Sequence, residues 1–501
     1  MKNKIIKILV FSGFITVSNS CTKLDSKVYD EVADFFNTPA QIAAGIAPGY
    51  LSLQGLAPTS DVYVLQEVTS DEVVVPTRGS DWFDNGNWQR LWLHTWTPND
   101  GAINGAWQFI YSGVARVNLI LEQVAGLNPQ PAGVAGINAE LKTIRAFYYF
   151  LALDLYGNVP IVADYKTDLS KVTSKPRAEV FAFVEKELKD NLAGLPDKSN
   201  STYGRMTKWF GNALLAKLYL NAQVYTGTAR WGDVITYTDA VISSNKYALE
   251  GNFFDNFVLN NQSSKETIFN IPMDVKKGVG GFGLQMATLH YQSNETFGIT
   301  AGPWNGFCST ADYYNQFDST DKRKQMFLVG QQYDPAGKPQ IDKQVNLPLI
   351  FDPAVTTISS TAPLFRMAGA RCAKYEFTKD TWGAMDNDWV VTRLADVYLM
   401  RGEAKFRSAT GDNGLADFNA VRSRAGVALW TAANLSLANI EKERARELSW
   451  EASRRTDMIR FGDYTNARVP DKAASGSFRT LFPIPKPQID RNPNLTQNPG
   501  Y

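Results

Sequence analysis

Acidic and aromatic residues alternate in one short stretch of the chain, which holds Asp71, Asp81, Trp82, Asp84 and Trp88. Two carboxylates that flank a glycosidic bond can cleave it, so this composition allows glycan hydrolysis. The same groups can also hold a neutral sugar without cutting it, because an indole covers the sugar's apolar face while carboxylates accept hydrogen bonds from its hydroxyls. We expect Trp82, Trp88, Asp71 and Asp81 to contact a ligand.

A second group of candidates lies far along the chain. Trp304 and Asn305 occur in PWNGF, and Arg371 occurs in GARCAKYEF. A tryptophan supplies a platform for a sugar ring, and an arginine supplies a fork of hydrogen-bond donors. Each of these three side chains also has a structural alternative inside the fold. One or both of Trp82 and Trp88 could instead be core residues, although the site is favoured for Trp82, and Asp71 could cap a turn.

The histidine content argues against histidine-dependent or zinc catalysis. The chain contains only His94 and His290, which are widely separated, and it has no HExxH, paired CxxC or GxSxG motif. Asp386 and Asp388 resemble the start of a calcium loop, but the glycine and distal glutamate of that loop are missing. We therefore predict no catalytic residues, no cofactor and no metal.

A glycine string, Gly278, Gly280 and Gly283, has the GxGxxG spacing of dinucleotide-binding loops. Neither the amphipathic helix nor the distal acidic residue of that motif follows it. The string is interpreted as a flexible loop.

The amino-terminal residues have the order of an export signal. A basic head with Lys2, Lys4 and Lys7 precedes an apolar run that is too short to span a bilayer, and Cys21 follows. Residues 1–20 are predicted to be a signal peptide, and the sequence resembles a lipoprotein signal in which Cys21 is acylated. We expect a lipid anchor at Cys21; the alternative is ordinary secretion.

Opposite charges nearly cancel, with 51 Lys plus Arg and 50 Asp plus Glu. No global field attracts nucleic acid, so we predict a neutral partner and no nucleic-acid binding. After Cys21 only Cys308 and Cys372 remain, and the sequence leaves open whether they pair. Residues 21–501 are expected to form a single composite unit.

Apolar residues recur at helical spacing in several stretches, most clearly at Leu141, Ile144, Tyr148, Leu151 and Leu155. Further helices are expected at 31–51, 103–124, 180–192, 210–222, 231–243, 390–397, 415–425 and 440–459. The predicted fold is mainly α, with tetratricopeptide-like helix pairs that form a scaffold over about 31–245 and 386–465.

The scaffold is interrupted by a predicted loop-rich region at about 246–385, where Gly, Pro, Asn and Ser separate short β-prone pieces. Its aromatic content argues against disorder, so we expect the ligand there. Residues 466–501 are expected to be an extended tail. From Leu481 onward the proline spacing predicts neither a helix nor a central strand.

A charged cluster at 443–457 could be mistaken for an active site. Glu451 precedes Arg454 and Arg455 by three and four residues, which is the spacing of ion pairs on a helix surface. The cluster is interpreted as a network that stabilises the fold.

Six segments give the chain a specific resemblance to the RagB/SusD family. They are RGSDWFDNGNWQRLWLHTWTP, AELKTIRAFYYFLALDLYGNVPIV, TRLADVYLMRGEA, NAVRSRAGV, ERARELSWEASRRTDMIRFG and LFPIPKPQIDRNPNLTQNPGY. The resemblance implies a surface lipoprotein of the Bacteroidetes outer membrane with an inserted loop-rich ligand region. It also implies a SusC-like TonB-dependent transporter as partner. Ligand contacts vary within the family, so no residue list is transferred.

Three hypotheses remain at this point. The first is non-catalytic binding of a neutral oligo- or polysaccharide at the cell surface and its delivery to the transporter. The second is a surface glycoside hydrolase that uses a carboxylate pair. The third is a scaffold that binds peptides or proteins.

Overall fold

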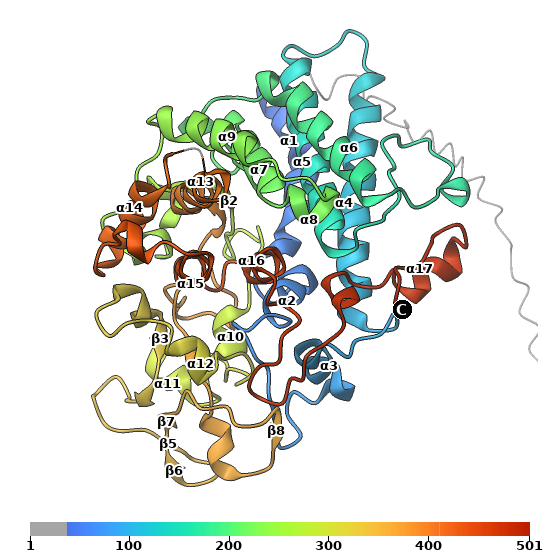
Figure 1. Ribbon diagram of the computed structural model, residues 1–501. Coiled ribbons are helices and arrows are strands. Elements are labelled where there is room, and N and C mark those ends of the chain that lie inside the picture. The colour runs from blue at the N-terminus through green and yellow to red at the C-terminus, as the bar shows by residue number, and fades with distance from the viewer. Residues whose placement is uncertain (1–37, 410) are drawn as a thin grey trace, which may run out of the picture.

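The computed structural model describes residues 38–409 and 411–501 (Figure 1). The predicted signal peptide and Cys21 lie outside the described residues. Helices carry most of the regular structure, and the strands form only two-stranded pairs. The predicted mainly α fold is confirmed.

The scaffold consists of helices from both sides of the loop-rich region. They are α1 (Pro39–Leu51), α2 (Asp61–Glu67), α4 (Gly101–Ala125), α5 (Val134–Leu155), α6 (Arg177–Asn191), α7 (Lys208–Leu220), α8 (Ala222–Thr226), α9 (Trp231–Ser243), α13 (Leu394–Ser408), α14 (Leu415–Ala425), α15 (Leu437–Glu447) and α16 (Arg454–Phe461). Helices α4 and α5, α5 and α6, α7 and α9, and α13 and α14 pack as pairs. Because α9 also packs on α13, the two stretches form one array.

Helix α5 shows why the array is tightly packed. Its predicted stripe, from Leu141 to Leu155, is buried, and Gly157 with φ of 72° follows its end. A Cβ on Gly113 of α4 would lie 2.1 Å from the ring of Tyr148, so α4 approaches α5 more closely than a larger residue would permit. The helical spacing therefore correctly identified a core element.

The prediction that a helix begins at Val390 was wrong. Val390 belongs to strand β10 (Trp389–Arg393), which pairs antiparallel with β2 (Thr267–Ile271), and α13 begins only at Leu394. Every residue of β2 and all but Val391 of β10 are buried. A fully buried apolar run of this length fits strand and helix equally well by spacing alone.

The single helix expected at 440–459 is two helices, α15 and α16, separated by a turn. Trp450 and Ala452 have φ of 60° and 58° in this turn, which breaks the helical path. Glu451 therefore pairs with Lys374 and Arg393 rather than with the nearby Arg454. The cluster is a buried ion-pair network, as interpreted, but its contacts join distant segments.

The loop-rich region lies opposite the scaffold helices, at the bottom of Figure 1. Its strands are β1 (Thr77–Arg78) parallel to β8 (Ser359–Ser360), and the antiparallel pairs β3 (Phe327–Leu328) with β9 (Arg371–Cys372), β4 (Gly330–Gln331) with β7 (Ile350–Phe351), and β5 (Ile341–Asp342) with β6 (Leu347–Pro348). Its helices are α10 (Leu284–Thr288), α11 (Ser293–Phe297) and α12 (Ala311–Tyr314). Strand β1 and α3 (Asn87–Leu93) connect the amino-terminal stretch to this region.

The prediction that the tail contains no helix was wrong, because Lys486–Arg491 forms α17. Pro487 lies in the first turn, where a proline removes no helical hydrogen bond. Elsewhere the tail lies along the scaffold: Phe482 N donates to Leu155 O at 2.8 Å, and Asn498 Nδ2 donates to Tyr156 O at 2.8 Å.

Cys308 and Cys372 are both buried, and neither forms a disulfide within the described residues. Among those same residues, no helix combines the length and the apolar character needed to cross a bilayer.

Candidate functional site

The Trp82 loop, which we define as residues 79–86, has an unusual backbone. Left-handed φ values occur at Gly79, Trp82, Asp84, Asn85 and Gly86. Glycine adopts this conformation freely and Asp and Asn tolerate it, whereas for a residue such as Trp82 it costs roughly 1–2 kcal/mol. Such strain persists only where the surrounding structure fixes it, and it is concentrated at functional sites.

Packing holds the Trp82 ring in place. The rings of Trp82, Trp88 and Phe307 meet edge to face, with centroids 5.3 to 5.7 Å apart. A Cβ on Gly306 would lie 2.3 Å from the Trp82 indole, so the ring rests directly on that backbone. Trp82 Nε1 donates to Trp304 O at 2.6 Å. The structure therefore brings Trp82, Trp88 and the Trp304 segment together.

Three aromatic side chains of this region remain open to solvent. Phe83 is 50% exposed, Trp304 is 43% exposed, and Trp382 is 80% exposed. Trp304 and Trp382 lie on segments attached to the same short helix, because Trp304 N donates to Met286 O at 2.7 Å and Gln285 Nε2 donates to Gly383 O at 3.3 Å. These rings offer apolar surface without a protein partner.

Trp382 was not among the predicted site residues. Its sequence context, a tryptophan next to Gly383 in a polar stretch outside any helical stripe, is the signal that could have identified it. A glycine- and aspartate-rich context predicts exposure of Trp82 in the same way.

Asp81 is exposed beside a cleft of about 250 Å³. Tyr291 donates its hydroxyl to Asp81 at 2.5 Å, and burial together with this bond raises the pKa of Tyr291 to about 12. The Arg366 guanidinium lies 4.8 Å from the centroid of the Tyr291 ring and also lines the cleft, with Ser80. The cleft thus offers both donors and acceptors to a polar ligand.

A second cleft, of about 530 Å³, is lined by Asp84 and Asn85 of the Trp82 loop and by residues that precede and follow the loop in the chain. Trp88 lines it, and its Nε1 donates to Asp84 at 2.6 Å. The remaining lining is mostly amide, hydroxyl and carboxylate side chains, including Asn85, Asn99 and Asp61. Burial raises the pKa of Asp61 to about 6. Polar groups beside an indole suit an uncharged, hydroxyl-rich molecule.

Asp71 has a different role from the one predicted. Arg454 binds both of its carboxylate oxygens, at 2.6 and 2.8 Å. Burial alone would raise the pKa of Asp71, but the Arg454 guanidinium outweighs it and holds the pKa below its usual value. Asp71 thus joins the amino-terminal stretch to α16, and Arg454 occupies the carboxylate that was predicted to contact a ligand.

Asn305 and Arg371 are fully buried, so the expected direct ligand contact conflicts with the structure. Arg371 Nη2 donates to Asn305 Oδ1 at 2.8 Å, and Asn305 Nδ2 donates to Arg366 O at 2.9 Å. Burial and the neighbouring Arg78 lower the pKa of Arg371 to about 9. Both side chains support the loops from beneath. Their residue types predicted polar contacts with a ligand, but the sequence did not show that both side chains are buried.

The three acids singled out in the sequence each have a protein partner. Asp71 is bound by Arg454, Asp84 by the Trp88 indole and Asp81 by Tyr291. No group of three or more metal-binding side chains occurs in 38–409 or 411–501.

Two family profiles match the chain. The one described as "SusD family" matches residues 359–501, and the one described as "Starch-binding associating with outer membrane" matches residues 24–220. Together they cover more than half of the sequence, including the Trp82 loop and the tail.

The chain is 24% identical over 467 residues to the starch-binding protein SusD of Bacteroides thetaiotaomicron, covering 84% of this chain and 82% of SusD. It is 25% identical over 420 residues to a SusD-like protein of Bacteroides ovatus, covering 79% and 71% of the two chains.

Among solved structures, a laminarin-binding SusD-like protein superposes with a TM-score of 0.75 at 22% identity, covering 93% of this chain and all of that one. Surface glycan-binding protein A from Bacteroides thetaiotaomicron, in complex with laminarihexaose, superposes with a TM-score of 0.73 at 21% identity, covering 92% and 100%. Profiles at both ends of the chain and a fold shared along its length agree: the chain belongs to the SusD/RagB family.

Proposed function

We propose that the protein captures an uncharged glucan at the outer membrane and passes it, uncut, to a SusC-like TonB-dependent transporter. The observations that carry this proposal are the exposed rings of Phe83, Trp304 and Trp382 and the two clefts, lined largely by polar groups, to which the Trp82 loop contributes. Flat rings bury the apolar faces of sugars at small entropic cost, and the polar groups hold the hydroxyls.

The glucan class rests on the relatives. One relative is named for starch, one structural relative is named for laminarin, and another is in complex with laminarihexaose; all three are built of uncharged glucose units. An acidic polysaccharide suits the cleft of about 530 Å³ less, because Asp61, Asp84 and Asp100 line it and Arg90 is the one cation among its lining residues.

Membrane attachment and transport complete the proposal. A lipid at Cys21 holds the protein at the outer membrane, in keeping with the outer-membrane association in the matched family description. A SusC-like barrel is the partner that the family implies. Only a few aromatic contacts offset the cost of association, so the affinity is modest and the glucan is released readily.

Affinity electrophoresis against starch, laminarin, xylan and polygalacturonate tests the proposal, with chromatography of the glycans after incubation. We expect retardation by at least one of the two glucans, little by polygalacturonate, and unchanged chain length. Release of reducing ends would establish the hydrolase instead. Retardation by no glycan would overturn the proposal and leave the peptide scaffold.

A further inference from the structure

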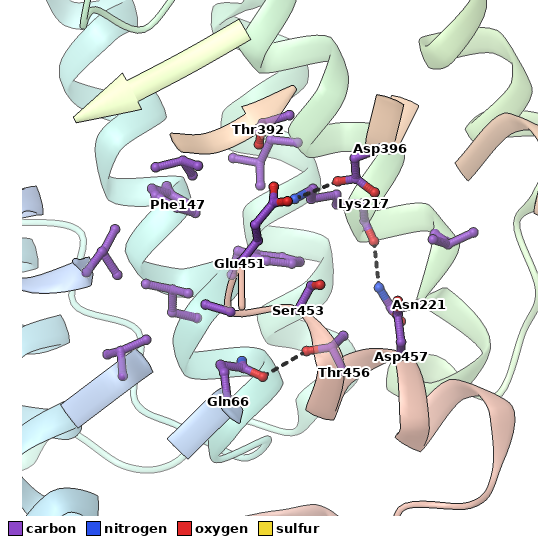
Figure 2. A pocket seen from close by; sticks show the side chains of 18 of the residues that line it. Gln66, Phe147, Lys217, Asn221, Thr392, Asp396, Glu451, Ser453, Thr456 and Asp457 are labelled. Carbon is purple, nitrogen blue, oxygen red and sulfur yellow. Dashed lines mark hydrogen bonds and ion pairs between the residues drawn. The ribbon is translucent and has the colours of Figure 1, made fainter. Parts of the chain in front are cut away.

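A cavity of about 100 Å³ lies inside the helical scaffold (Figure 2). Its walls come from α2, α5, α7, β10, α13, α15 and α16. None of the residues that line it belongs to the two clefts beside the Trp82 loop. The proposed glucan site therefore does not explain it.

One part of the lining is apolar. Helix α5 contributes Phe147, Phe150 and Leu151, and α7 contributes Phe210 and Leu214. These side chains are at most 9% exposed, and the rings of Phe147 and Phe210 meet edge to face at 5.5 Å. They form a dry surface for an apolar group.

The rest of the lining is polar, and its charges balance. Lys217 pairs with Asp396 at 2.9 Å, and Arg460 Nη1 donates to Asn221 Oδ1 at 2.9 Å. The lining cations are Lys217, Arg444 and Arg460, and the lining anions are Asp396, Glu451 and Asp457. A charged ligand would upset this balance at a buried site.

Arg444 is the group that points to a ligand. It is 3% exposed, and its Nε and Nη2 atoms donate to Asp457 at 2.8 and 3.1 Å. Its Nη1 has no hydrogen-bond partner anywhere in the described part of the chain. An unpaired buried donor costs roughly 1–3 kcal/mol, so an acceptor placed beside it would be bound favourably.

We propose that this cavity binds a small neutral amphipathic molecule, with its acceptor oxygen on Arg444 Nη1 and its apolar body against Phe147, Phe210 and Leu214. The volume limits the guest, because an apolar cavity of about 150 Å³ accommodates benzene, which has six non-hydrogen atoms. At about 100 Å³ this cavity takes a neutral guest of about four non-hydrogen atoms, such as a small ketone or alcohol. The guest reaches the cavity past Val391, Ala452 and Ser453, which line it and are partly exposed.

Acetone is the test probe, because it joins a carbonyl acceptor to two methyl groups. Titration calorimetry on the full mature protein should show saturable binding of acetone. Acetate and isopropylammonium have similar shapes but carry charge, and they should bind at least about tenfold more weakly. A crystal soaked with acetone should show its oxygen within hydrogen-bonding distance of Arg444 Nη1.

Leu214→Phe is the matched variant, because it fills the apolar end without touching the ion pairs. It should reduce acetone binding by about tenfold or more and leave glucan binding unchanged. The soaked crystal decides the outcome even if this variant folds poorly. No saturable binding, equal binding of all three probes, or acetone density outside the cavity would overturn the proposal.

Discussion

Buried arginines have different partners in the scaffold and beneath the Trp82 loop. In the scaffold, Arg393 binds carboxylates of Glu266 and Glu451, at 2.9 Å each, and also Glu447. Beneath the Trp82 loop, Arg78 and Arg371 bind carbonyl and amide oxygens, and neither has a carboxylate partner among the described residues. Arg323, elsewhere in the loop-rich region, resembles the scaffold arginines, because it pairs with carboxylates. The scaffold arginines thus neutralise buried acids, whereas Arg78 and Arg371 hold backbone.

This difference explains where ligand-binding groups can remain free. In the scaffold, arginines pair with acids from distant segments, so these carboxylates are held in place and are not free to bind a ligand. Beneath the Trp82 loop, arginines hold the loops through Asn305 O and Ala368 O, which leaves Asp81 and the Trp304 ring at the surface. Rigid support beneath exposed side chains is what a binding site requires.

The largest expected effect is on the scaffold network. Arg393→Ala leaves three buried carboxylates without their shared cation, which should lower the free energy of unfolding by about 3–5 kcal/mol. Urea denaturation measures this. The matched control is Lys186→Ala, which removes an exposed pair with Asp190 and should leave the free energy of unfolding nearly unchanged. Similar costs for both variants would contradict the contrast between buried and exposed pairs.

Glu72 gives a pH test at the junction of the two regions. Burial raises its pKa to about 8, with Glu67 and Asp71 nearby, and Trp450 N donates to its Oε1 atom. The folded state therefore keeps a proton that the unfolded state releases above about pH 4.5, so stability falls as pH rises toward 8.

Glu72→Gln cannot lose this proton. The variant should gain about 2–4 kcal/mol relative to the unmodified protein between pH 5 and pH 8. Urea denaturation at both pH values measures the gain. Parallel stability curves for the two proteins would show that Glu72 does not titrate in this range.

Trp82→Ala tests the loop-rich side of the comparison. It removes a ring that packs on Trp88 and Phe307 and whose Nε1 positions the Trp304 segment. Glucan affinity should fall by about tenfold or more, because a central aromatic anchor is lost. Fluorescence titration with the preferred glucan measures this. An unchanged affinity would place the ligand elsewhere.

The smallest expected effect concerns Tyr291. Tyr291→Phe removes the hydrogen bond to Asp81 but keeps the ring, so glucan binding should weaken by only about 0.5–1.5 kcal/mol. Asp81→Asn should have a similar effect if the acid accepts from a sugar hydroxyl. Titration calorimetry of both variants, compared with the unmodified protein, checks this.

Sequence reasoning worked where one local signal decided the structure. The stripe in α5 and the Gly157 stop predicted that helix well, and a glycine-rich context selected Trp82. The predictions failed where contacts between distant segments determined the local structure. Burial on both faces made Val390 a strand residue, and left-handed turns at Trp450 and Ala452 redirected Glu451 to Arg393.

The burial of individual side chains was the other property that the sequence did not predict. Asn305 and Trp304 are adjacent, yet Asn305 is fully buried and Trp304 is 43% exposed. Arg371 lies on a two-residue strand beneath the same surface. Residue type predicted which groups can bind sugars, but the path of the irregular backbone determines which of them reach solvent.

Titration calorimetry of the preferred glucan with the double variant Trp304→Ala/Trp382→Ala tests passive capture by exposed rings most directly. The control is Trp231→Ala, which removes a half-buried tryptophan from the start of α9 in the scaffold. We predict that the double variant loses measurable binding while the control binds like the unmodified protein. Full binding by the double variant would contradict the central role of these rings.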